Sequence, residues 1–108
     1  MKKFMVFYLS AVSAESQMNV SPEDMKKNME PWTNWFKKIG SALVEAGGPL
    51  GEAVSINNKY ETPPAQITGY SIIQAENIEE AKTIMEDQPF LTIIGGTIEI
   101  REILPSAM

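Results

Sequence analysis

The chain has 108 residues, a length typical of one domain, and 44% of them are hydrophobic while 21% are charged. That balance is typical of a globular protein, and no apolar run approaches the ~18 residues of a membrane-spanning helix, so we expect no membrane contact. The formal net charge of -5, with no basic cluster larger than a doublet, argues against nucleic-acid binding.

Cysteine and histidine are both missing from the sequence. Their absence removes disulfides, a thiolate nucleophile, the commonest general base and the commonest metal ligands. No glycine-rich loop with a lysine follows the first predicted strand, as nucleotide binding would require. We therefore expect neither a metal nor a cofactor.

Residues 3–12 predict the first strand, because aromatic and β-branched types are frequent there. Large apolar side chains alternate onto both faces, a pattern typical of a strand that is covered on both sides. The stretch up to Ala14 loosely resembles a secretory signal peptide. Such a peptide would be shorter than the usual ~15 to 30 residues and its removal would delete this strand, so we expect a cytoplasmic protein.

A long helix should begin at residues 21–24, where Ser21 can cap and Pro22 suits the first helical position. Apolar residues then recur at spacings of three and four up to Ala46, and Gly47-Gly48-Pro49 supplies a stop. Pro31 interrupts this pattern, so we expect a kink near Met29 or two abutting helical segments.

The remaining elements follow in the order strand, strand, helix, strand. Residues 50–56 and 67–75 predict strands, and the polar residues 57–66 between them predict an extended connection. A capping-box-like start at residues 77–80 predicts a short helix that ends before Pro89, and residues 97–104 predict the last strand.

The order β-α-β-β-α-β predicts an α+β, ferredoxin-like fold: a four-stranded antiparallel sheet with both helices on one face. The opposite face would then be bare, although the first strand carries apolar residues there and residues 67–75 add Ile72-Ile73. An open apolar face of that size marks an interface. We therefore predict a homodimer formed through this face.

Four segments in this order resemble the YCII-related family: Ser-Pro-Glu-Asp-Met at 21–25, Gly-Tyr-Ser-Ile-Ile at 69–73, Ile-Glu-Glu-Ala at 78–81 and Gly-Gly-Thr-Ile-Glu-Ile-Arg at 95–101. The resemblance implies a single YCII-related domain over residues 1–108 and a dimeric α/β barrel, in which two sheets pack face to face. Some related proteins carry out cofactor-free dehalogenation or isomerase-like chemistry.

The sequence departs from the family in two places. The Asp-Gly-Pro-Phe motif of one branch is missing, and a His-Asp pair suspected to be catalytic in some members cannot form without histidine. In many relatives a histidine follows the proline after the second helix, and here that position is Phe90.

Glu99 and Arg101 share one face of the last strand, where they can form a structural or interfacial ion pair or anchor a ligand carboxylate. Tyr8 and Tyr70 lie on strands that this topology makes central and adjacent. Their hydroxyls can line an apolar cavity and donate a proton, or simply pack with one hydrogen bond.

Trp32 and Phe36 favour core packing, whereas Trp35 lies off the main apolar stripe and can border a pocket or the dimer seam. Together these residues give a candidate ligand pocket: Tyr8, Trp32, Trp35, Tyr70, Phe90, Glu99 and Arg101. No catalytic residue is assigned.

The sequence thus predicts a small homodimeric YCII-like protein that binds a small organic ligand, in a cleft between the long helix and the sheet or at the dimer seam. Two alternatives stay open: a cofactor-free enzyme of lyase, isomerase or dehalogenase type, and a regulatory interaction domain without a ligand.

Overall fold

The computed structural model describes residues 1–10, 20–54, 56, 67–92 and 96–105. Strand β1 spans Lys2–Leu9, helix α2 Pro22–Ile39, strand β2 Leu43–Pro49, strand β3 Ile67–Ala75, helix α3 Ile78–Met85 and strand β4 Thr97–Glu102. Short 3-10 helices precede β2, at Gly40–Ala42 (η1), and β4, at Pro89–Thr92 (η2). The predicted connection at residues 57–66 lies outside the described residues.

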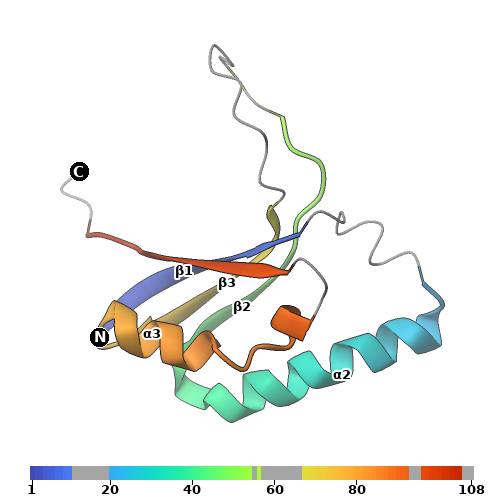
Figure 1. The fold of residues 1–108 in the computed structure, drawn as a ribbon, viewed down its shortest axis with the longest axis horizontal. Coiled ribbons are helices and arrows are strands. Elements are labelled where there is room, and N and C mark those ends of the chain that lie inside the picture. The colour runs from blue at the N-terminus through green and yellow to red at the C-terminus, as the bar shows by residue number, and fades with distance from the viewer. Residues whose placement is uncertain (11–19, 55, 57–66, 93–95, 106–108) are drawn as a thin grey trace.

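The four strands form one sheet in the order β2-β3-β1-β4, with each neighbouring pair antiparallel. Helices α2 and α3 both lie on one face of this sheet (Figure 1). This is the ferredoxin-like α+β arrangement that the order of elements predicts, with β1 and β3 in the centre.

Helix α2 begins as the sequence predicts. The Ser21 hydroxyl accepts a hydrogen bond from the Asp24 amide at 3.2 Å, and Pro22 occupies the first turn. The helix runs through Pro31 without a break, so the alternative of two abutting segments is wrong. Between Pro22 and Ile39, only Pro31 lacks the amide hydrogen that a helical residue normally donates.

The predicted end of this helix and the predicted second strand are both wrong. Helix α2 ends at Ile39, where Gly40 takes a positive φ of 53°. Strand β2 then occupies Leu43–Pro49 instead of residues 50–56. Leu43 and Ala46 continue the helical spacing of apolar residues, but the helix has already ended at Gly40. Leu43 instead pairs with Ile73 of β3.

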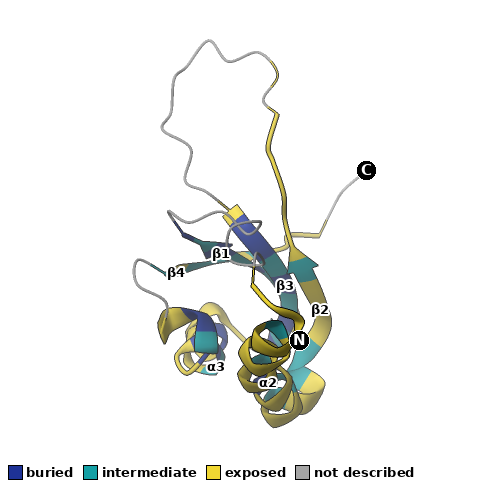
Figure 2. Ribbon diagram, turned by 90° about the vertical axis from the view of Figure 1, so that its right-hand side faces the viewer, coloured by how far each residue is buried: buried dark blue, intermediate teal, exposed yellow. Residues whose placement is uncertain are grey.

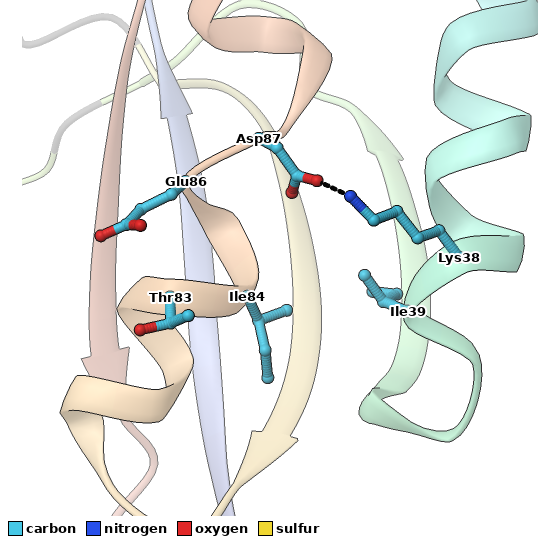
Figure 3. A pocket seen from close by; sticks show the side chains of 6 residues that line it. All are labelled: Lys38, Ile39, Thr83, Ile84, Glu86 and Asp87. Atoms are coloured by element: carbon cyan, nitrogen blue, oxygen red, sulfur yellow. Dashed lines mark hydrogen bonds and ion pairs between the residues drawn. The ribbon is translucent and has the colours of Figure 1, made fainter.

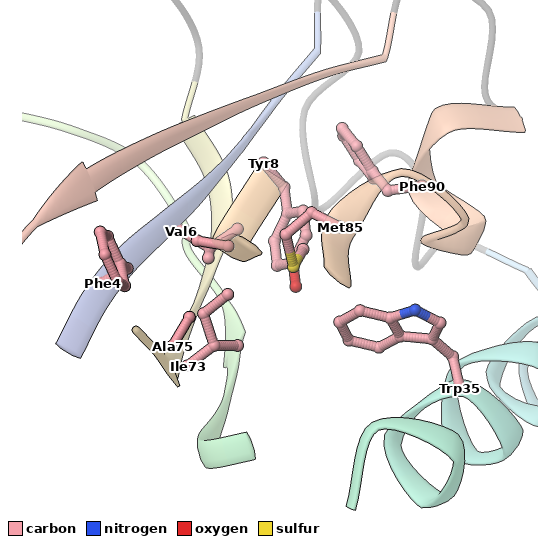
Figure 4. Packing of buried hydrophobic residues seen from close by; sticks show 9 residues of the cluster. Phe4, Val6, Tyr8, Trp35, Ile73, Ala75, Met85 and Phe90 are labelled. Carbon is pink, nitrogen blue, oxygen red and sulfur yellow. The ribbon is translucent and has the colours of Figure 1, made fainter. Parts of the chain in front are cut away.

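The core lies between the sheet and the two helices. Among the residues that the structure describes, it contains nine buried hydrophobic side chains: Phe4, Val6, Tyr8, Trp35, Ile73, Ala75, Ala81, Met85 and Phe90. Figure 4 shows Phe4, Val6 and Tyr8 extending from β1 into this layer. Figure 2 shows buried positions on β3 and α3, whereas most of α2 is exposed.

The opposite face of the sheet is open. Among the described residues no helix covers it (Figure 1), and its central side chains are half-buried: Met5, Phe7, Leu9, Tyr70 and Ile72. These positions alternate with the core residues of β1 and β3, as expected for strands. The structure therefore has the bare apolar face that the sequence predicts.

Candidate functional site

Tyr8 lies near the end of β1, on the helix side of the sheet, and only 2% of its surface is exposed. Its ring meets that of Trp32 from α2 edge to face, with centroids 5.0 Å apart, and that of Phe90 from η2 at 5.3 Å. Phe36 packs against Trp32 at 6.1 Å. We call Tyr8, Trp32, Phe36 and Phe90 the aromatic cluster.

Hydrogen bonds fix the direction of the Tyr8 hydroxyl. It lies 2.8 Å from the Ser71 hydroxyl on β3, which in turn donates to the carbonyl oxygen of Ala46 on β2 at 2.7 Å. Because Ser71 has one hydroxyl hydrogen and gives it to Ala46, Tyr8 must be the donor to Ser71. The phenolic oxygen of Tyr8 then keeps its lone pairs as acceptors.

Burial raises the pKa of Tyr8 from 10.0 to about 12, although the Ser71 and Gln88 side chains each lower it in part. Tyr8 is therefore a neutral phenol at physiological pH. A phenol with such a pKa is a poor general base, so the site favours hydrogen bonding over proton abstraction.

Gln88 is the polar residue that sequence reasoning missed at this site. Its side chain is 1% exposed, and its Oε1 accepts a hydrogen bond from the Phe90 amide. This bond fixes the amide orientation, with Nε2 as the free end. Nε2 is buried and makes no short, well-aligned hydrogen bond among the described residues. A weaker side-chain hydrogen bond to the Tyr8 oxygen, which keeps its lone pairs, lowers the phenol pKa.

Ser71 was also missed, although the sequence carried a signal for it. It is spaced by two and four residues from Ile73 and Ala75, so all three share the buried face of β3 and the Ser71 hydroxyl lies there. Gln88 has only a weak signal, a polar residue just before Pro89.

The expectation for the aromatic residues of α2 is wrong: Trp35 packs in the core, with 3% of its surface exposed, while Trp32 and Phe36 are half-buried beside it. Its Nε1 donates to Asp87 Oδ1 at 3.1 Å, and Lys38 Nζ donates to Asp87 Oδ2. The bond from Lys38, followed by that from Trp35, lowers the pKa of Asp87. These contacts tie α2 to the segment after α3.

Tyr70, Glu99 and Arg101 lie on the open face, away from Tyr8. The Tyr70 hydroxyl donates to Glu45 Oε1 at 2.9 Å, and this bond raises the Tyr70 pKa. Arg101 Nε donates to Glu99 Oε1 at 2.8 Å, which confirms the expected ion pair. The seven candidate residues therefore divide between two faces and do not line one pocket.

A separate cleft of about 370 Å³ opens between the C-terminal ends of α2 and α3 (Figure 3). It contains none of the residues predicted from the sequence, being lined by Lys38, Ile39, Thr83, Ile84, Glu86 and Asp87. Lys38 and Asp87 already bond each other there, so they offer little charge to a ligand.

Within the described part of the chain, no three acidic side chains come together as a metal site would need. None of the helices described is long and apolar enough to cross a membrane.

The fold and the site together define a ferredoxin-like α+β protein with an open sheet face on one side and a buried polar group under an aromatic cluster on the other. The family model of the YCII-related domain matches residues 4–107, and the chain belongs to this family. No curated protein and no solved structure matches the chain.

Proposed function

We propose that this YCII-related protein is a homodimer that binds a small organic molecule on the helix side of its sheet, beside Tyr8 and Gln88. The observation that carries the proposal is the Gln88 amide nitrogen, which is buried and makes no short, well-aligned hydrogen bond among the described residues. An unsatisfied buried donor costs roughly 1–3 kcal/mol. Native proteins keep few such groups, and a ligand that accepts the hydrogen bond accounts for this one.

The surroundings of this amide suit a small molecule. Trp32 and Phe90 supply aromatic surface, and the Tyr8 hydroxyl and the Gln88 amide supply the few polar groups that orient a ligand in such sites. The hydrogen of Tyr8 is already donated to Ser71, so binding is better supported here than acid–base catalysis.

The open sheet face supports the homodimer. Half-buried Met5, Phe7 and Ile72 occupy its middle, and the Tyr70–Glu45 and Glu99–Arg101 pairs flank them. Two copies related by a twofold axis can bury the same patch on each subunit, as most homodimers do. The cytoplasmic location stays a prediction.

A thermal-shift screen of small organic molecules tests the ligand site, with two variants run in parallel. Gln88→Met removes the amide donor, and Thr83→Val alters the separate cleft between α2 and α3 while keeping side-chain shape. We expect compounds that stabilise the unmodified protein to lose their effect in Gln88→Met and to keep it in Thr83→Val. Compounds whose stabilising effect is lost in Thr83→Val and kept in Gln88→Met would place the ligand in the cleft and contradict the proposal. An empty screen would also contradict it, since a single buried water would then satisfy the amide.

A further inference from the structure

We propose that the outer edge of β4 pairs with the β4 edge of a second copy, antiparallel and about a twofold axis at Ile100. This contact is separate from the open sheet face. Among the described residues, β4 is hydrogen-bonded to a strand on one side only, where it meets β1. Figure 2 shows β4 at one border of the sheet. An edge of this kind is a template for a further strand.

The edge of β4 is regular enough to accept a strand. Its pairing with β1 runs from Thr97 to Glu102 without a bulge. Strand β2, at the other border of the sheet, is irregular between Leu43 and Gly48 and ends in Pro49, so it is poorly suited to further pairing.

The backbone groups that face outward from β4 follow from one hydrogen bond. The Ile103 amide donates to the carbonyl oxygen of Lys3, on the β1 side, at 2.8 Å. Backbone groups of successive residues in an antiparallel sheet point alternately to one neighbouring strand and to the other. The N–H and C=O groups of Ile98, Ile100 and Glu102 therefore face away from β1, where a second strand can bond them.

The charges on β4 select one register for that strand. With the axis at Ile100, Glu99 lies opposite the partner's Arg101, and Arg101 lies opposite the partner's Glu99. Both are non-hydrogen-bonded pairs, in which side chains approach most closely, and opposite charges stabilise such pairs. An axis at Glu99 or at Arg101 would instead place like charges directly opposite, which is destabilising.

The side chains at this edge are available to a second copy. Arg101 bonds Glu99 within the chain, yet 70% of its side chain is exposed, so the two pairs can join in one network of four charges. On the helix side of the strand, Ile98 and Ile100 are only half-buried. One pair of strands covers less than the about 1,600 Å² of a standard interface, so the contact should form reversibly above the micromolar range.

Sedimentation equilibrium from micromolar to millimolar concentration tests the proposal. We expect the mass of the species present at micromolar concentration to double. Glu99→Arg and Arg101→Glu each place like charges opposite across the edge, and each should weaken this step about tenfold or more. An equimolar mixture of the two variants should restore it, because opposite charges then meet between the two kinds of chain. An ion pair within one chain would not be restored by mixing.

A proline variant tests the backbone pairing directly. Glu102→Pro removes an outward N–H and leaves the hydrogen bonds to β1 in place. Glu102→Ala is the matched control, because it loses the same side-chain contact with Lys2 and keeps the amide. We expect the second association step to disappear in Glu102→Pro and to persist in Glu102→Ala.

Three results would overturn the proposal: a mass that stays constant up to millimolar concentration, a mixture that associates no better than its components, or association that persists in a folded Glu102→Pro. If Glu102→Pro folds poorly, the mixing experiment decides, since it changes only charged side chains at the sheet border. The open-face dimer is measured at micromolar concentration with a different variant, Phe7→Glu, so either contact can fail without the other.

Discussion

The pKa of Tyr8 measures how strongly the candidate site excludes water. Its pKa rises from 10.0 to about 12 on folding, so between these values the unfolded chain has lost the phenolic proton while the folded chain keeps it. The stabilising contribution is complete below the unfolded pKa and is lost as the pH rises through the folded one. The two-unit shift corresponds to roughly 3 kcal/mol. Urea unfolding just below pH 10 and near pH 12 measures this loss.

Two phenylalanine variants isolate the contribution of Tyr8 to that pH dependence. Tyr8→Phe should flatten the decline in the free energy of unfolding, because no phenol remains there to ionise. Tyr70→Phe should keep most of it, because Tyr70 lies on the exposed face. An unchanged decline in Tyr8→Phe would show that the phenol is solvated, contrary to this account.

Sequence reasoning found the aromatic part of the site and the Tyr8 hydroxyl, and missed the polar side chains of Ser71 and Gln88. Tyr8, Trp32 and Phe90 were all candidates, and the structure brings them together. Their types and spacing carry that information. The buried Gln88 amide could not be predicted, because its role depends on which groups its two ends meet after folding.

At the scale of elements, strand β2 holds the Ala46 carbonyl where Ser71 can reach it. The β2–β3 register is irregular between Leu43 and Glu45 and again between Glu45 and Gly48. Gly47 lies in this irregular stretch with a φ of 71°. The carbonyl oxygen of Ala46 accepts from the Ser71 side chain there. The bulged strand thus anchors the hydrogen-bond chain that starts at Tyr8.

Gly47→Ala should destabilise the protein by about 2 kcal/mol or more. A Cβ at this position would lie 2.0 Å from the Tyr70 carbonyl oxygen, on a backbone conformation that other residues rarely adopt. The neighbouring Gly48 is the matched control, because a Cβ there meets nothing within 4 Å. Chemical denaturation of both variants measures the difference, and equal losses would refute the explanation.

The start of helix α2 was predictable and its end was not. Ser21 and Pro22 are local signals, and they act in the structure as their types suggest. Leu43 and Ala46 continue the helical spacing, but they belong to β2, where Leu43 pairs with Ile73. Pairing between distant segments overrides a local pattern of this kind, so the strand was misplaced.

For the whole molecule, the central claim is that a second copy covers the open sheet face. Phe7 lies in the middle of this face, paired across the sheet with Tyr70 on β3 and Glu99 on β4. If the dimer forms through this face, replacing Phe7 with a charged residue should break it, since a buried unpaired charge costs several kcal/mol.

Light scattering at micromolar concentration tests this claim most directly, with Phe7→Glu beside the unmodified protein. A specific interface of standard size removes about 1,600 Å² from water, enough for a stable dimer. We predict twice the 12.0 kDa mass of one chain for the unmodified protein, and monomers or aggregates for Phe7→Glu. A folded, monodisperse protein with the mass of a single chain would contradict the account.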